Sequence, residues 1–457
     1  MEIGSYNYHT KSFKSLSYPS SWKRLFPNKT GVLLESVQGG QYTLVAPRVA
    51  QWITCDNSKN SLEAGCPELT LQQWIDPRLS QNRYAGGLVS LISYDWGKEY
   101  WLRERFLPKK NDLPLPRMVF ALVLEGYVWD KKTNELLVFQ WHKDPDPVRF
   151  TKYAQGQKIL WQKATEDPSR DFPKKHLETI QSKNTFPKKE FTEAVKKIHQ
   201  WIAKGHTYQV NLSMRQQTSY HGCPWILYEI LRKINPSPYM GVFAFTDFTL
   251  ISGSPELLGK IDGCKLIARP IAGTRKLGKS AIEKISLQKD LFNSHKEKAE
   301  HLMLVDLIRN DLGRVCSLGS VYVSEFMHRE KYSHVQHIVS QVEGKKDQRK
   351  SIQDILLALF PGGTITGAPK IRTMEIIEAL EPVSRNFYTG SLGWIGFNGE
   401  AEWNILIRSI LLLQKVAYWQ TGAGIVIDSD PESEYQECLD KAEAQRIALT
   451  YWKGSGA

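Results

Sequence analysis

Residues 360–370 read Phe360-Pro-Gly-Gly-Thr-Ile-Thr-Gly-Ala-Pro-Lys370 and lead into a segment with helical spacing. A glycine-rich loop before a helix can present backbone N–H groups to an anion. The GxxxxGK[ST] spacing of a nucleotide-binding P-loop is absent here. The stretch therefore predicts a turn at the start of a helix over 368–380, which either binds an anion, though not as a P-loop does, or has a purely structural role.

Apolar spacing around this loop predicts strands and helices along the whole chain. Strands are predicted over 31–36, 42–46, 86–94, 118–128, 135–141, 208–215, 388–397, 403–413 and 416–423, and helices over 187–204, 225–234, 299–310, 352–360 and 432–451. We predict an N-terminal region at 1–148, a polar connector at 149–189 and a catalytic region at 190–450.

Two acidic pairs lie far apart in the chain, Glu297 with Glu300 and Glu434 with Glu437. Each pair has i, i+3 spacing, so its carboxylates share one face of a helix. Carboxylates that face one another suit Mg²⁺, which keeps some waters and takes its other oxygens from a substrate. A solvated helix face is the alternative interpretation of each pair taken alone.

The chain of 457 residues carries a formal charge of +12, from 60 basic and 48 acidic residues. Such a charge can attract a small polyanion, nucleic acid or anionic lipid, or it can simply keep a surface soluble. The basic residues are dispersed, and no nucleic-acid motif is present. The apolar stretch 405–413 contains Arg408 and is too short to span a bilayer. We expect neither a nucleic-acid nor a membrane partner.

The cysteines predict a cytoplasmic protein. They are scattered, form no CxxC pair and give no zinc signature; they are Cys55, Cys66, Cys223, Cys264, Cys316 and Cys438. Reduced thiols fit this pattern best. The polar segment 1–21 also lacks the apolar core of a signal peptide.

Several motifs in one order resemble a known family. They are Ser254-Pro-Glu256, Arg269-Pro-Ile-Ala-Gly-Thr-Arg275, the segment from Ala299 to Asp311, Gly362 to Lys370, and Gly422-Ala-Gly424 followed by the Glu434/Glu437 segment. Together they resemble the chorismate-utilising enzymes, which include the large subunits of anthranilate synthase and aminodeoxychorismate synthase. The resemblance implies an α+β fold in which large antiparallel β-sheets pack as a sandwich surrounded by helices.

The resemblance also implies roles for individual residues. Glu300 and Glu437 would ligate Mg²⁺, with Glu297 and Glu434 close by, and the metal would hold the ring carboxylate of chorismate. Glu256 would be the general acid that protonates the departing 4-hydroxyl. His337 and Thr364 would line the reacting ring. The enolpyruvyl carboxylate would be bound by Tyr388, Arg408, Lys441 and the turn of Gly422, Ala423 and Gly424.

Gln209 and Ala272 bear on which nucleophile attacks. Water-using relatives have a Lys at the position of Gln209, and Gln cannot act as that base, so ammonia from a separate glutamine amidotransferase subunit is expected. Some relatives have a Lys that attacks C2 where this chain has Ala272, which closes that covalent route. The motifs around 209–212, 360–367 and 403–408 favour 4-amino-4-deoxychorismate as the product, for 4-aminobenzoate and folate synthesis. Ala272 favours anthranilate, the alternative product.

A regulatory site is a further expectation. Leu34-Glu35-Ser36 and Pro238-Tyr239-Met240 match family segments that bind tryptophan. A strand end packed against a turn is the alternative interpretation. A non-catalytic protein that senses tryptophan or chorismate is a second alternative function, although Glu256, Glu300, Glu437 and Arg408 disfavour it.

Overall fold

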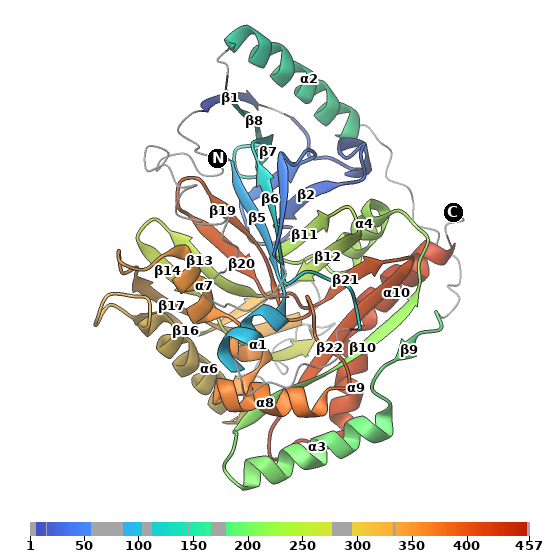
Figure 1. The fold of residues 1–457 in the computed structure, drawn as a ribbon, viewed down its shortest axis with the longest axis vertical. Helices are drawn as coiled ribbons and strands as arrows, with labels where there is room; N and C mark the ends of the chain where they lie inside the picture. The colour runs from blue at the N-terminus through green and yellow to red at the C-terminus, as the bar shows by residue number, and fades with distance from the viewer. Residues whose placement is uncertain are drawn as a thin grey trace, which may run out of the picture.

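The protein is described by a computed structural model that covers residues 6–14, 16–55, 86–102, 112–143, 146–165, 180–276, 295–331 and 335–454. Two large β-sheets form its centre, with helices around them (Figure 1). All strand pairings between the described strands are antiparallel. The predicted α+β sandwich of antiparallel sheets is confirmed.

The first sheet has twelve strands. Its order is β1 (Asn7–Lys14), β8 (Glu135–His142), β7 (Glu125–Asp130), β3 (Tyr42–Ala46), β2 (Gly31–Glu35), β11 (Tyr239–Ala244), β12 (Phe248–Ser254), β21 (Ser409–Leu413), β22 (Val416–Ile425), β10 (Gln209–Ser219) and β18 (Gly367–Ala368), with β9 (Lys183–Asn184) beside β10.

The second sheet has ten strands. Its order is β15 (Ile271–Lys276), β17 (Val335–Lys345), β14 (Lys265–Ala268), β13 (Leu257–Asp262), β20 (Ala401–Asn404), β19 (Ser391–Gly396), β5 (Gly87–Ile92), β6 (Met118–Val123) and β4 (Gln51–Cys55), with β16 (Tyr322–Lys331) on β17. Both sheets join strands from the two sides of residues 149–189, since β2 pairs with β11 and β5 with β19.

Helices cover the outer faces of the sheets and their lower end (Figure 1). They are α1 (Tyr94–Leu102), α2 (Pro147–Thr165), α3 (Lys188–Ala203), α4 (Pro224–Ile234), α6 (His295–Gly313), α7 (Ile352–Leu359), α8 (Lys370–Leu380), α9 (Pro431–Lys441) and α10 (Glu443–Gly454). Local signals set their ends: Ser351 and Asp354 form a capping box at α7, and Asp430 accepts from the Ser433 N–H at α9.

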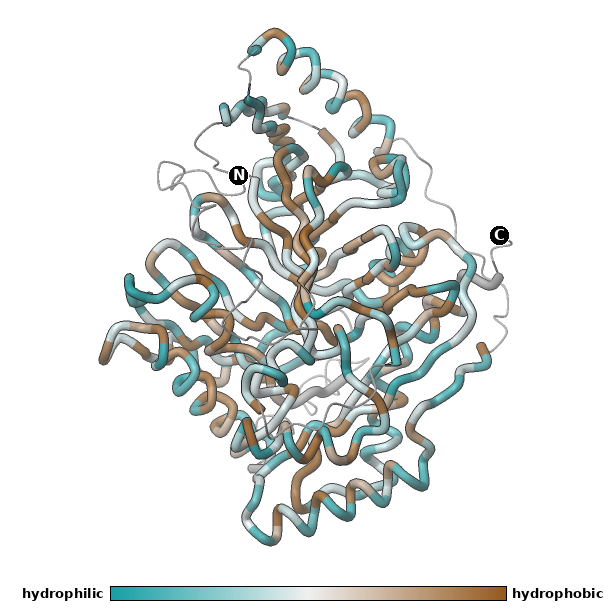
Figure 2. Tube along the Cα trace, viewed as in Figure 1, coloured by the Kyte–Doolittle hydropathy of each residue, from teal (hydrophilic) through white to brown (hydrophobic). Residues whose placement is uncertain are grey.

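Apolar side chains fill the space between the sheets and under the helices. Val89, Phe120 and Leu250 belong to one buried cluster that receives residues from both sheets. A second cluster, which contains Trp161 and Trp225, lies where helices cover the first sheet. Hydrophobic residues accordingly concentrate on the central strands in Figure 2. Burial of such side chains stabilises the fold by about 1.5–3 kcal/mol each.

The predicted strands over 118–128 and 403–413 are each wrong as single strands. The first divides at Leu124 into β6 and β7, and the second divides over 405–408 into β20 and β21. In both, the chain leaves one sheet and enters the other. Arg408 therefore lies in the crossover, with φ of +52°, and the prediction that it sits inside a strand is wrong. The single helix predicted over 432–451 likewise divides between α9 and α10, at Ala442.

Other expectations can be compared with the described residues. The segment 149–189 contains most of α2, and residues 166–179 lie outside the description. Cys223, Cys264, Cys316 and Cys438 are free, but Cys55 is disulfide-bonded, so the prediction of reduced thiols is wrong there. Cys66 lies outside the described residues.

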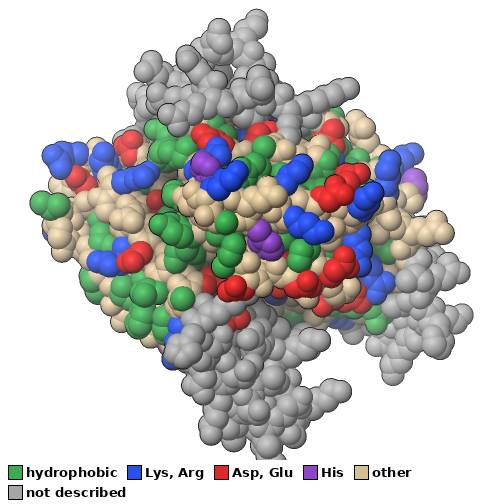
Figure 3. Space-filling model, turned by 90° about the horizontal axis from the view of Figure 1, so that it is seen from below, with side chains coloured by type: hydrophobic (Ala, Val, Ile, Leu, Met, Phe, Trp, Pro, Cys, Tyr) green, Lys and Arg blue, Asp and Glu red, His purple; other side chains and the backbone are tan. Residues whose placement is uncertain are grey.

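The surface carries both signs of charge. Seen from below, Lys and Arg side chains are interspersed with Asp and Glu rather than gathered in one patch (Figure 3). Of the helices in the described ranges, none has the length and apolar character needed to cross a bilayer.

Candidate active site

Glu256 lies where the chain passes from β12 in the first sheet to β13 in the second. The neighbouring crossover holds this turn in place, because Ser254 Oγ donates to the Ile405 carbonyl at 2.6 Å and Ile405 N–H donates to the Glu256 carbonyl at 3.0 Å. The Glu256 carboxyl and the Arg408 crossover are therefore positioned together.

Burial raises the pKa of Glu256 from its ordinary value to about 7. The Thr364 hydroxyl and the charges of Lys441 and Arg408 act in the opposite direction. Thr364 lies in the short turn Gly363–Ile365, and its buried hydroxyl lies close to the Glu256 carboxyl. A carboxyl with this pKa can hold a proton near neutral pH and release it to a leaving group.

Of the acidic pair Glu297 and Glu300, Glu300 lies beside strands β10 and β22. Gln209 Nε2 donates to Glu300 Oε1 at 2.8 Å. A Cβ atom added at Gly424 would lie 2.6 Å from Gln209 Nε2 and 3.8 Å from Glu300 Oε1. Helix α6 therefore brings its carboxylate to the Gly422–Gly424 segment.

The second acidic pair reaches the same segment through Lys441. Lys441 Nζ donates to the Gly422 carbonyl at 3.1 Å and forms an ion pair with Glu437 Oε1 at 2.7 Å. The structure thus places Glu300 and Glu437, 137 positions apart in the sequence, beside the same three residues of β22. The buried Glu434 accepts a hydrogen bond from Ser429 Oγ at 2.6 Å, and Glu297 lies one helical turn before Glu300.

This donor set fits a hard divalent cation. Within the described ranges no three His, Cys, Asp or Glu side chains gather tightly enough to hold a metal by themselves. Two carboxylates from different helices beside the Gly422–Gly424 segment suit Mg²⁺, which keeps several waters and takes further oxygens from a substrate.

Tyr388 stands over Gly422. A Cβ atom added at Gly422 would lie 2.9 Å from Tyr388 Oη and 2.6 Å from Asn211 Oδ1, so a side chain there would displace one of them. The Arg385 guanidinium lies 5.6 Å from the Tyr388 ring and forms a buried ion pair with Glu381 at 2.7 Å. Burial raises the pKa of Tyr388, so its hydroxyl keeps its proton and can donate.

His337 and Ala272 lie on the adjacent strands β17 and β15, and both are buried. Ala272 is in register with Ile338. The side chain of Lys276, a basic residue near Ala272 in sequence, lies outside the description, as does all of Lys279.

The predicted anion-binding turn contains glycines that packing requires. A Cβ atom at Gly363 would lie 1.8 Å from Leu307 of α6, and one at Gly367 would lie 2.0 Å from the Gln209 carbonyl. Gly367 also has φ of +137°. These glycines let the loop approach both α6 and β10 closely, which positions Thr364 near Glu256.

Sequence reasoning missed three residues beside this site. Asn211 shares a face of β10 with Gln209, a signal that strand alternation offered. Glu381 lies at the end of α8 and Arg385 in the turn that follows it, so neither residue carried such a signal.

The five residues of the predicted tryptophan site line one cavity, located between β2, β11 and the second sheet; they are Glu35, Ser36, Pro238, Tyr239 and Met240. The cavity has a volume of about 70 Å³. Glu35 is buried, and its carboxylate accepts hydrogen bonds from Tyr18 at 2.6 Å, Arg232 at 2.7 Å and Tyr228.

Two curated relatives are similar to this chain over most of its length. Over 452 residues the chain is 39% identical to aminodeoxychorismate synthase component 1 of Bacillus subtilis, which covers 96% of this chain and 95% of that protein. Over 373 residues it is 40% identical to anthranilate synthase component 1 of Aquifex aeolicus, covering 80% and 75%.

Solved structures show the same architecture. Anthranilate synthase component I from Streptococcus pneumoniae superimposes with a TM-score of 0.76 at 29% identity, covering 90% of this chain and 93% of that one. The isochorismate synthase MenF of Escherichia coli, at 19% identity and a TM-score of 0.74, shares the fold, covering 97% and 94%. The model of the chorismate binding enzyme family matches residues 30–446, and the chain therefore belongs to that family.

Proposed function

We propose that this protein aminates chorismate to 4-amino-4-deoxychorismate, a precursor of 4-aminobenzoate and folate. The observation that carries the proposal is the convergence of a buried acid, Glu256, with cationic groups and two carboxylates around Gly422–Gly424. The near full-length match to an aminodeoxychorismate synthase component supports this product. A glutamine amidotransferase subunit would supply the ammonia, as the name "component 1" suggests. We also propose a cytoplasmic location, which the four free cysteines favour and the disulfide at Cys55 disfavours.

In the proposed reaction, chorismate and ammonia give 4-amino-4-deoxychorismate and water. Protonated Glu256 gives its proton to the departing 4-hydroxyl, which leaves as water. The nitrogen of ammonia forms a bond to C4 as the C4–O bond breaks, and the Glu256 carboxylate then takes one proton from that nitrogen. Arg408, Lys441 and Tyr388 would hold the enolpyruvyl carboxylate, while His337 and Thr364 would line the ring.

We propose that Glu300 and Glu437 hold a Mg²⁺ ion, with Glu297 and Glu434 in support. When bound, Mg²⁺ supplies positive charge that neutralises the ring carboxylate of the substrate. Gln209 positions Glu300 through its amide N–H, and Lys441 positions Glu437. Gln209 also leaves the site without a base to activate water, which favours ammonia as the nucleophile.

Anthranilate is the alternative product. Ala272 presents no nucleophile to C2, so ammonia could add there directly and pyruvate could then leave. A second alternative is a non-catalytic sensor. The protein is incubated with chorismate, ammonium and Mg²⁺, and the loss of chorismate is monitored by chromatography. A loss that depends on ammonium and Mg²⁺ indicates an enzyme rather than a sensor. We expect rapid consumption; unchanged chorismate would refute an enzymatic function.

Glu437→Gln should weaken Mg²⁺ binding and reduce activity, because the cation loses a formally negative ligand. Calorimetric titration of Mg²⁺ with chorismate present should show a raised Kd, and the Mg²⁺ concentration for half-maximal rate should rise in parallel. Glu432→Gln is the matched control: Glu432 lies on the same helix, is exposed and pairs with Lys188. Equal Mg²⁺ affinity in the two variants would refute the role of Glu437.

We also propose that tryptophan binds the cavity at Glu35 and Met240. The support is that residues from β2 and β11 enclose one space, where Glu35 and Met240 are in register. Isothermal calorimetry with tryptophan should give saturable heat, and thermal denaturation should show stabilisation. No heat and no thermal shift at millimolar tryptophan would remove the proposal.

A further inference from the structure

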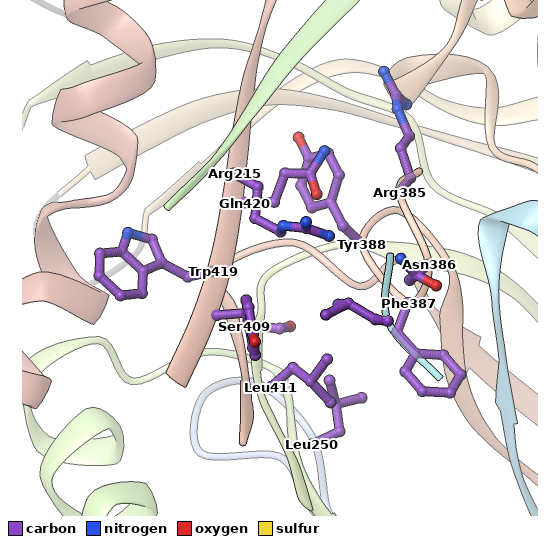
Figure 4. A pocket seen from close by; sticks show the side chains of 12 residues that line it. Arg215, Leu250, Arg385, Asn386, Phe387, Tyr388, Ser409, Leu411, Trp419 and Gln420 are labelled. Carbon is purple, nitrogen blue, oxygen red and sulfur yellow. The ribbon is translucent and has the colours of Figure 1, made fainter. Parts of the chain in front are cut away.

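A cavity lies beside the candidate active site, behind Tyr388. Apolar side chains such as Leu411 supply part of its lining (Figure 4). The polar part comes from Arg215, Arg385, Asn386, Tyr388, Ser409 and Gln420. Its volume is about 40 Å³, enough to admit a molecule the size of water or ammonia. Figure 4 shows the Arg215 and Gln420 side chains next to the Tyr388 ring.

Three buried polar atoms in this lining have no hydrogen bond to any described residue. They are Gln420 Oε1, Arg215 Nε and Asn386 Oδ1, and each of the three residues is at most 4% exposed. An unsatisfied buried donor or acceptor costs about 1–3 kcal/mol. The cavity therefore favours a small molecule that can both donate and accept a hydrogen bond.

The orientation of the Gln420 amide is fixed by its neighbours. Ser213 Oγ donates to Glu381 Oε1 at 2.7 Å, so its one proton is used. Ser213 Oγ must then accept from Gln420 Nε2, which lies 2.8 Å away. The amide nitrogen faces Ser213, and the amide oxygen is left for a molecule in the cavity.

Further buried amide oxygens without a hydrogen bond to a described residue lie on the same face of β10, between the cavity and Glu300. Gln209, Asn211, Ser213 and Arg215 lie on one face of β10. Among them, Ser213 already bonds to Glu381 and Gln420. Asn211 Oδ1 and Gln209 Oε1 are also buried without a hydrogen bond to a described residue. On β22, Gln420 is in register with Arg215, while Gly422 and Gly424 follow towards Glu300 and carry no side chain.

We propose that this row of atoms is a binding path for neutral ammonia, an inference that rests on the proposed function. As ammonia moves along this row, its N–H bonds can donate in turn to the amide oxygens of Gln420, Asn211 and Gln209. Its lone pair can accept from Arg215 Nε, which an ammonium ion cannot do. The path selects the neutral form, the form that can attack the ring, and no covalent bond changes along it.

Gln420→Met tests the path, since it keeps the side-chain volume and removes the amide. With ammonium chloride as the nitrogen source, the KM for ammonia should rise roughly three- to tenfold, the effect of losing one hydrogen bond. The kcat at saturating ammonia and the KM for chorismate should remain those of the unaltered protein. The KM calculated for neutral NH₃ should be independent of pH.

Gln216→Met is the matched control. Gln216 lies on the opposite face of β10 and accepts from Trp419 Nε1 at 2.8 Å, so it also loses one buried hydrogen bond. Asn211→Ala provides a second test of the path if Gln420→Met does not fold. An ammonia KM unchanged in a folded path variant, or raised equally in the control, would overturn the path. Absence of chorismate amination by the unaltered protein would overturn the proposed function itself.

Discussion

Glu256→Gln is expected to lower kcat for chorismate amination by about 10²–10⁴-fold, the usual contribution of a general acid. Gln has nearly the same shape but no proton of suitable acidity for the departing hydroxyl. The KM for chorismate should change little, because the role of Glu256 lies in the chemical step. Steady-state kinetics with saturating ammonia measures both constants, and an undiminished kcat would show that another group is the acid.

The pH dependence of kcat/KM provides a second test of Glu256 as the general acid. Because burial raises the pKa of Glu256 to about 7, the carboxyl is protonated below that pH and loses its proton above it. The kcat/KM for chorismate should therefore fall as pH rises through about 7. The residual rate of Glu256→Gln should lack this decrease, and persistence of the same limb in the variant would assign it to a different group.

The same pKa shift predicts that Glu256 lowers stability above pH 7. The unfolded carboxyl ionises near 4.5 and the folded one near 7, so the folded state loses stability as pH rises between these values. The full loss is up to about 3 kcal/mol. Glu256→Gln should thus unfold at a higher temperature than the unaltered protein at pH 8, and this gain should shrink towards pH 4.5. If Glu256→Gln is inactive but has a raised melting temperature, misfolding is excluded as the cause of the lost activity.

Arg408→Gln is expected to raise the KM for chorismate by roughly 10- to 100-fold. A hydrogen bond to a charged group contributes about 1.5–3 kcal/mol, and the dianionic substrate would lose this one. Because the Arg408 charge lowers the pKa of Glu256, removing that charge should raise this pKa. The decrease of kcat/KM with rising pH should then occur at a higher pH.

Arg309→Gln is the control for that experiment. Arg309 lies on α6, is half exposed and forms an ion pair with Asp306, so its loss removes a positive charge at the surface. It should change neither the KM nor the pH limb. An unchanged KM in Arg408→Gln, or an equal change in the control, would contradict the assigned role of Arg408.

Local patterns predicted much of the fold. The apolar spacing of Phe191, Val195 and Ile198 places them on the buried face of α3, as expected. The strand predicted over 31–36 also matches β2. These elements are continuous within one layer, so their periodicity reports burial directly.

The crossovers between the sheets could not be predicted in this way. Runs such as 118–128 and 403–413 stay apolar while the chain changes sheets, so periodicity shows no break at Leu124 or Arg408. The functional consequence is large, since Glu256 and Arg408 both occupy such crossovers. Their placement depends on pairing between strands distant in sequence.

The candidate site, like the fold, could be predicted only in part from the sequence. Motif resemblance named Glu300, Glu437 and Lys441, and the structure places all three around the Gly422–Gly424 segment. Gln420 went unnoticed because an amide on a strand is unremarkable until its oxygen is seen to lack a partner. Hydrogen-bond satisfaction is a property of three-dimensional neighbours and has no one-dimensional signature.

The most direct measurement of the central claim is the identity of the product formed from chorismate, Mg²⁺ and ammonium. The reaction is run with and without an added aminodeoxychorismate lyase, and the products are separated by chromatography with fluorescence detection. We predict 4-aminobenzoate only when the lyase is present, and no anthranilate. Anthranilate formed without the lyase would contradict the account and make Ala272 the residue that decides the product.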